Sequence, residues 1–441
     1  MKKLILGISI IAFTTSVYGD AAESNQSNAP TAEKKEIKKV EESNALGFKI
    51  FGETSTNHYV HSMKRRNENE GKGRGNHLAV EDSRINIEVK GNYLDHEIGF
   101  LIGITGNASE GNNPIEENRI KIKGNWGTIL AGDTKSASDF MNADTSYFSG
   151  GTGGVLGNYK NVINETTGAI LSTDLLHKFT PKDQTKLIYV SPNIYGFQAA
   201  YNYIPDGAHK GEQKLMTHSP TSAGMATISS DKKLSGQNLH EFVVKFKKKD
   251  FYNVNIDWSA AFITGKMRNL QNSFAMICQK ERVQRGLTTD ASVERHNLSS
   301  YSTGLVLSYN GFSIGSEYVD NRNSGQLKIL NKANLGKIWT LGIGYNDDIN
   351  NISLVYLNSK RHLGKFEETH FGHARADNYA LTYDRRIVPG FTLYAEGLLV
   401  NHRNSNQSNL QDWHTAFNGF DGDVVHSNKG KILITGARIN F

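Results

Sequence analysis

The connections between the expected strands constrain this chain most strongly. From residue 47 onward, segments of alternating apolar and polar residues recur, the pattern of strands with one apolar and one polar face. Short turns such as "GNWG" and "SPNIYG" alternate strictly with long polar stretches, so all long connections are expected at one end of a sheet. The sixteen predicted strands are 47–62, 80–92, 96–107, 117–124, 128–134, 184–191, 195–206, 238–248, 252–266, 297–309, 312–321, 338–347, 351–361, 375–386, 391–403 and 429–441.

The polarity of these segments indicates which face meets water. In "SRINIEVKG", Ile85 and Ile87 oppose Arg84 and Glu88. A face that carries such charges cannot form a packed interior, because burying an unpaired charge is too costly. The pattern therefore favours an apolar face toward lipid and a charged face toward a water-filled lumen. We predict an all-β fold, a transmembrane antiparallel β-barrel of sixteen strands with short periplasmic turns and long outer loops.

The amino-terminal region predicts export. Residues 1–19 combine Lys2 and Lys3 with an apolar core and small residues near Gly19, which is typical of a cleaved signal peptide. Residues 20–46 are polar and predict a flexible periplasmic leader, with a contact to peptidoglycan or a partner as the alternative. The barrel domain is then 47–441. Export makes nucleic acid an improbable partner despite the net charge of +6.

Several stretches resemble the general porins of Gram-negative bacteria. "ITGARINF" looks like the carboxy-terminal signature of outer-membrane proteins, and "SRINIEVKG", "NWGTILAGDT" and "LIYVSPNIYGFQAAYNY" resemble three successive strand regions of general porins. The resemblance implies a homotrimer of sixteen-stranded diffusion channels in the outer membrane, folded by the barrel-assembly machinery. It also implies that the third long loop, here 135–183, folds into the lumen.

The same resemblance implies a constriction with acidic residues on the third loop and basic residues on the wall. Asp139 and Asp144 are the acidic candidates, and Arg84 is the wall residue that matches the family motif. Asp133 stands where the family usually has an arginine, which leaves the ion selectivity open.

Alternation alone suggests further basic residues on the lumen wall that could compensate for Asp133. The three candidates lie on one predicted strand and are Arg119, Lys121 and Lys123.

Motifs of outer-membrane enzymes and metal sites are weak here. His426 and Ser427 faintly resemble a phospholipase motif, but adjacent residues of a strand point to opposite faces. Histidines three residues apart in "HYVH" and "HFGH" also alternate faces, and "GKGRG" lacks the context of a phosphate-binding loop. We therefore expect no catalytic, cofactor or metal site and no enzyme activity.

The first outer loop offers a cationic surface that could bind lipopolysaccharide phosphates or a neighbouring subunit, or could simply be solvated. Its cations are Lys64, Arg65, Arg66, Lys72 and Arg74. The sequence thus predicts a general diffusion porin for small hydrophilic solutes and ions. The alternatives are a substrate- or anion-selective channel and a barrel plugged by its loops that acts as a surface adhesin.

Overall fold

The structure is a computed structural model. It describes residues 46–65, 73–106, 115–163, 171–175, 184–207, 236–267, 294–328, 330–366, 368–405 and 428–441. The predicted signal peptide and almost all of the leader lie outside these residues, as do Arg66, Lys72, Cys278, His426 and Ser427. In the described part of the chain, no helix has the length and apolar character needed to cross a membrane.

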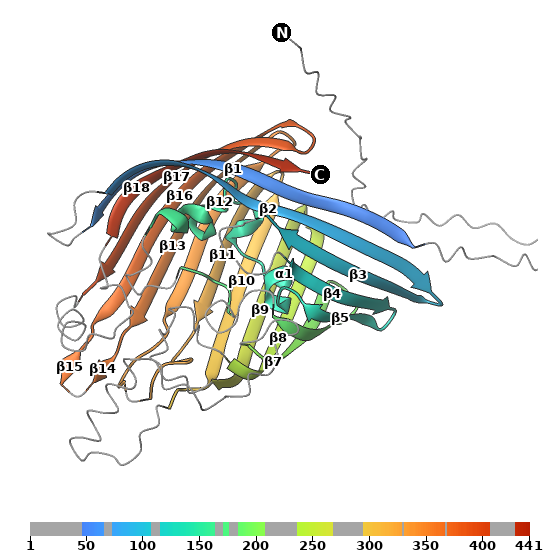
Figure 1. Cartoon of the computed structure of the whole chain (residues 1–441), viewed down its shortest axis with the longest axis horizontal. Helices are drawn as coiled ribbons and strands as arrows, with labels where there is room; N and C mark the ends of the chain where they lie inside the picture. The colour runs from blue at the N-terminus through green and yellow to red at the C-terminus, as the bar shows by residue number, and fades with distance from the viewer. Residues whose placement is uncertain are drawn as a thin grey trace, which may run out of the picture.

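Sixteen strands form one closed antiparallel barrel, as the sequence predicts (Figure 1). Each strand pairs with its neighbours in sequence, and β18 pairs with β1 to close the ring. The barrel strands are β1 (Gly47–Arg65), β2 (Gly73–Tyr93), β3 (His96–Thr105), β4 (Ile115–Gly124), β5 (Gly127–Asp133), β6 (Thr185–Val190), β7 (Phe197–Asp206), β8 (Gly236–Phe251), β9 (Val254–Met267), β10 (Leu298–Tyr309), β11 (Phe312–Asp320), β12 (Lys337–Asn346), β13 (Asn350–His362), β16 (His373–Val388), β17 (Phe391–Asn404) and β18 (Asn428–Asn440).

The carboxy-terminal strand β18 pairs with β1, and the pairing extends to Phe441. The register of β18 on β1 runs from Arg65 opposite Asn428 to Glu53 opposite Asn440. Beyond it, the backbone amides of Gly52 and Phe441 each donate to the other's carbonyl, at 2.9 and 3.0 Å. The strand therefore closes the barrel up to its last residue.

The short turns use local side-chain chemistry. Between β12 and β13, the Asp347 carboxylate accepts hydrogen bonds from the backbone amides of Asn350 and Ile349, at 2.6 and 2.8 Å. These donors stabilise the charged form, so the backbone bonds from Asn350 and then Ile349 hold the pKa of Asp347 below its usual value. Such Asx-type turns allow two antiparallel strands to reverse within a few residues.

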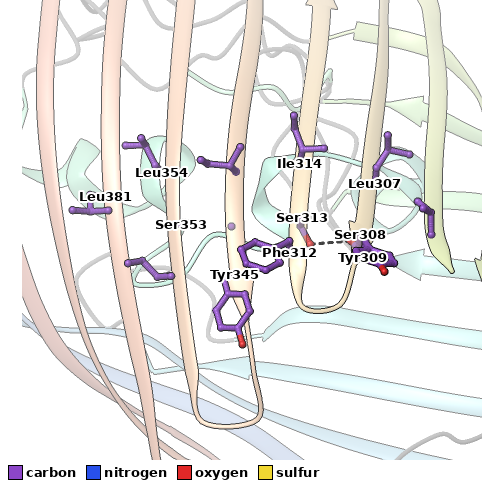
Figure 2. Close-up of a pocket in the computed structure, with 14 residues that line it drawn as sticks. Leu307, Ser308, Tyr309, Phe312, Ser313, Ile314, Tyr345, Ser353, Leu354 and Leu381 are labelled. Carbon is purple, nitrogen blue, oxygen red and sulfur yellow. Dashed lines mark hydrogen bonds between the residues drawn. The ribbon is translucent and has the colours of Figure 1, made fainter.

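The outer face of the barrel is apolar, as the alternation predicts. Along β12, burial alternates residue by residue, so that Ile338 and Thr340 are buried while Leu341 and Ile343 are exposed. Figure 2 shows a groove on this face at the turn ends of β10–β13, where Leu307, Ile314, Leu354 and Leu381 lie side by side with aromatic rings near the turns. This is the surface expected against lipid chains.

Two of the long connections contain structure that the sequence pattern did not reveal. The connection between β13 and β16 holds a small separate sheet of β14 (Lys365–Phe366) and β15 (Thr369–His370). The connection between β5 and β6 holds α1 (Ala137–Met141) and three 3-10 turns, η2 (Thr145–Tyr147), η3 (Gly154–Leu156) and η4 (Asn158–Val162). Figure 1 shows these helices inside the ring of strands.

Candidate functional site: the lumen and its constriction loop

A group of ion-paired side chains lies on the inner wall at β2 and β4. The guanidinium of Arg84 contacts Glu117 at 2.5 Å and donates to Asn86 at 2.9 Å. Arg119 reaches the other carboxylate oxygen of Glu117 at 3.2 Å, and the Thr134 hydroxyl donates to the same oxygen at 2.6 Å. One acidic side chain therefore joins two of the predicted basic residues into a single network.

The other two predicted basic residues lie farther along β4 toward the short turns. Lys121 forms an ion pair with Glu97 of β3 at 2.7 Å, and Lys123 is the direct cross-strand neighbour of Glu97. The basic row expected from alternation therefore exists, but carboxylates of β3 and of β4 itself are interleaved with it. Sequence reasoning missed Glu97 and Glu117 because their importance depends on the strand register.

A hollow of about 680 Å³ opens beside this network. It is bounded by Arg84 and Arg119 on the wall and by Lys135 and Phe140 from the loop that carries α1. The lining of this hollow thus combines paired charges of both signs with apolar side chains such as Leu101 and Leu130.

The two predicted acidic residues of the loop take part in the caps of its short helices. The carboxylate of Asp139 accepts the backbone amide of Ser136 at 3.0 Å, and Ser136 in turn caps α1. Asp144 caps η2 by accepting the Ser146 amide at 2.8 Å. These bonds fix the loop's local shape. A role for either carboxylate opposite Arg84 remains a proposal.

Asp133 lies apart from the Arg84 network. It pairs in register with Asn118 and Thr185, and its carboxylate accepts the Thr185 hydroxyl at 2.5 Å. On β6, Thr185 alternates with the exposed Leu187 and Tyr189 on one face of the strand. The adjacent Lys186 is buried and lies on the opposite, inward face. Lys186 donates to the Thr134 carbonyl, at the start of the loop.

The loop after β5 is fastened to the opposite wall by buried carboxylates. At α1, Glu241 of β8 accepts the Ala137 amide at 3.1 Å and the Ser138 hydroxyl, and Asn202 also donates to it at 2.9 Å. Farther along the loop, the Glu317 carboxylate of β11 accepts a hydrogen bond from the side-chain amide of Asn142 at 2.6 Å. The wall is therefore the acidic partner here, and the loop supplies the donors.

Two more carboxylates hold the middle of the loop. Asp384 of β16 accepts the Gly151 amide at 2.5 Å. Glu396 of β17 accepts the Thr152 amide at 2.8 Å and the Thr152 hydroxyl at 2.9 Å. Arg438 of β18 donates to the Gly151 carbonyl. Glu396 is fully buried, so losing its donors would leave a costly unsatisfied group.

After η3, the loop reaches the strands near the closure of the barrel. The Asn158 side chain donates to Glu81 and to Asp82 of β2, each at 2.9 Å. Tyr159 is fully buried and accepts from Asn378 of β16 at 2.7 Å. The described part of the loop thus runs along the inner wall from β7 to β17 and then contacts β2.

Glycines on the wall let the loop approach the strands closely. The Phe148 ring lies over Gly315, Gly342 and Gly344, and a Cβ added to any of them would come within 3 Å of a neighbouring atom. At Gly304, an added Cβ would lie 1.8 Å from the Ala143 carbonyl oxygen. With the buried Val306, Val319 and Val355, these strands and the loop form a packed core inside the barrel. The inner face here is therefore not the charged, solvated wall that the sequence predicted.

Comparisons with known proteins agree with this architecture. The model of the Gram-negative porin family matches residues 16–407. This chain belongs to that family. The anion-selective porin of Comamonas acidovorans has a TM-score of 0.54 at 11% identity, covering 90% of this chain and all of that one. OmpT of Vibrio cholerae has a TM-score of 0.53 at 13% identity, covering 91% of this chain and all of that one.

A sequence relative adds little about activity. An uncharacterised protein of Rickettsia typhi is 24% identical over 243 residues, which span 51% of this chain and 52% of that protein. Family and fold together support an outer-membrane channel rather than an enzyme. The described residues contain no group of three or more His, Cys, Asp or Glu side chains that could hold a metal ion.

Proposed function

We propose that the barrel is a passive channel in which small hydrophilic solutes and ions pass beside the loop, along the inner wall of β2–β4. The observation that carries this path is the fastening of the loop to β8, β11, β16 and β17 by Glu241, Glu317, Asp384 and Glu396. The loop covers that side of the lumen, while the hollow opens beside Arg84 and Arg119. Diffusion down a gradient needs no cofactor.

The charges along this path favour weak selectivity. Arg84, Arg119 and Lys121 each contact a carboxylate, so the field at the wall alternates in sign over a few ångströms. Opposed charges orient polar solutes and discourage apolar ones. Anion preference is the second candidate, and Lys123 on this wall and Lys135 on the loop beside it favour it.

The test is single-channel conductance in a planar bilayer, with the reversal potential measured under a salt gradient. The proposal expects stable, ohmic steps with weak selectivity, and a strongly anion-selective reversal potential would favour the second candidate. A protein that inserts without any conductance would contradict both and favour the loop-plugged adhesin.

We further propose that the chain is exported by the signal peptide 1–19, folded by the barrel-assembly machinery and assembled as a homotrimer among outer-membrane lipids and lipopolysaccharide. A trimer form is reported for OmpT of Vibrio cholerae, 15% identical with a TM-score of 0.51. Polar side chains on the outward face near the barrel closure support a protein-covered surface, since lipid disfavours them: His58 bonds Asn76 at 2.6 Å beside Thr56 and Thr435. Cross-linking of the purified protein followed by mass determination tests the trimer.

A further inference from the structure

Two histidines meet on the inner face of the barrel, at the end that bears the long connections. His61 lies on β1 and His77 on β2, and their ring centroids are 5.9 Å apart with the ring planes at 74°. We call these two residues the histidine pair. Tyr59 shows which way they point: its hydroxyl donates to Glu81, the carboxylate that the constriction loop also contacts. His77 is the direct cross-strand partner of Tyr59, and His61 follows Tyr59 by two residues, so both imidazoles share its inward face.

Neighbouring residues hold both imidazole rings in place. The Tyr59 ring stacks on His77, with centroids 4.8 Å apart and planes at 12°. His61 lies over Gly75 of β2, where an added Cβ would come within 2.0 Å of its Nε2 atom, so the glycine leaves the space through which this ring reaches toward β2. The Nδ1 atom of His61 is buried, and no hydrogen-bond partner for it lies among the described residues. A buried ring nitrogen of this kind is a candidate ligand for water or a metal ion.

The spacing and the local charge suit two imidazoles that share one metal ion. A ligating nitrogen lies about 2.0–2.1 Å from such an ion, which puts the centroids of two ligating rings about 4.5–6.5 Å apart, depending on the angle at the ion. The separation in the histidine pair falls within this range. In the described stretches 57–61 of β1 and 75–81 of β2, the inward positions hold no cationic side chain, and Glu81 adds a negative charge. This part of the inner face therefore favours a cation.

A second pair of histidines meets neither condition. His362 and His373 are direct cross-strand partners of β13 and β16, and their ring centroids are only 4.0 Å apart. The next pair in the same register on that face is Lys360 and Arg375, whose positive charges disfavour a further cation. This second pair therefore provides a comparison within the same molecule.

We propose that the histidine pair binds a late first-row divalent metal ion, Cu²⁺ most tightly, on the inner face of β1 and β2. Imidazole nitrogens are ligands for copper, zinc and nickel, and the affinity of a nitrogen site is highest for Cu²⁺ in this series. With two protein ligands, water completes the coordination. The spacing along one strand gave no reason to expect this site, because His58 and His61 of "HYVH" point to opposite faces and the second ligand comes from β2.

The proposal rests on the proposed function only in placing the ion in a water-filled lumen, so binding is tested without conduction. Cu²⁺ is titrated calorimetrically into the purified protein in detergent, with glycine as a weak competitor that suppresses binding to single histidines. We expect one tightly bound ion per chain. In His77→Gln the affinity should fall at least about tenfold, because even the loss of a residue that only orients a ligand costs that much. His77 is exposed, so the glutamine should leave the barrel folded.

Electron paramagnetic resonance of the Cu²⁺ complex of the unmodified protein needs no variant and should show hyperfine splitting from two nitrogen ligands. The matched controls are His58→Gln, on the outward face of β1, and His362→Gln, from the second pair. Both should bind Cu²⁺ as the unmodified protein does. Unchanged affinity in His77→Gln, splitting from a single nitrogen, or an equal loss in His362→Gln would overturn the proposal. A protein that binds Cu²⁺ at the histidine pair but never conducts would instead count against the proposed channel and leave the metal site standing.

Discussion

The two sides of the lumen use acidic residues in opposite ways. On β2–β4, Glu117 and Glu97 face arginine and lysine side chains beside an open hollow. On β8–β17, Glu241 and Glu396 face backbone amides and hydroxyls of the loop and are fully buried. Inward-facing carboxylates can therefore either pair with cations on a solvated wall or hold the loop in place by accepting its hydrogen bonds. The role of each carboxylate depends on whether the loop covers it.

Removing two anchors should affect the channel most. In Asp384→Ala/Glu396→Ala, the amides of Gly151 and Thr152 lose their acceptors, which costs about 3 kcal/mol or more of loop attachment. We expect a larger and noisier single-channel conductance in a planar bilayer. The control is Glu88→Ala, on the open side. Conductance and noise equal to those of the unmodified protein would break the proposed contrast between the two sides.

Crowding the contact between loop and wall should have the next largest effect. Gly304→Val introduces a Cβ where the Ala143 carbonyl oxygen lies, and the backbone of the loop must move away. The bond from the Ala143 amide to Ser259, 2.8 Å long, would weaken. We expect increased current noise and faster proteolysis of the loop. Gly397→Val serves as the control, because an added Cβ there meets no atom within 4 Å.

On the open side, a charge change should alter selectivity and leave the loop in place. Arg84→Gln removes one positive charge, whereas Glu117 keeps Arg119 and Thr134 as partners. We expect the ratio of K⁺ to Cl⁻ permeability, obtained from the reversal potential, to rise about twofold with little change in noise. An unchanged reversal potential would show that ions do not pass this wall.

A single hydrogen bond of the loop should give the smallest effect. Tyr159→Phe keeps the buried ring but loses the bond from Asn378, which should reduce the free energy of unfolding by about 1 kcal/mol. Urea unfolding followed by tryptophan fluorescence measures this change. Tyr147→Phe, on the exposed part of the same loop, should be neutral. A loss of several kcal/mol for Tyr159→Phe would mean that the ring itself is displaced.

The sequence predicted the barrel well because strand alternation and turn length are local properties. All sixteen barrel strands were expected, and most boundaries agree within about three residues; β2, which begins at Gly73 rather than near residue 80, is the main exception. The basic candidates also lie on expected strands, Arg84 on β2 and Arg119, Lys121 and Lys123 on β4.

The constriction could be predicted only in part, because its contacts join residues far apart in the chain. Asp139 and Asp144 were predicted as acids on the loop, but both take part in the caps of short helices, which depend on the loop's folded shape. Glu241 and Glu396 gave no local signal, since one acidic residue in an alternating strand looks the same whether solvent or a loop covers it. The glycines beneath Phe148 are visible as a group only once the strands are in register.

The central claim is that the loop covers the β8–β17 side of the lumen and leaves the β2–β4 side open to solutes. Thiol accessibility in an open channel tests it directly, in a background with Cys278→Ser. Lys121→Cys replaces a side chain that is about one-third exposed, and Thr382→Cys replaces a fully buried one that the Gly150 amide contacts at 3.0 Å. We predict that a charged methanethiosulfonate reagent rapidly reduces the current through Lys121→Cys and leaves that through Thr382→Cys unchanged. Equal rates at the two positions, or faster modification of Thr382→Cys, would contradict the account.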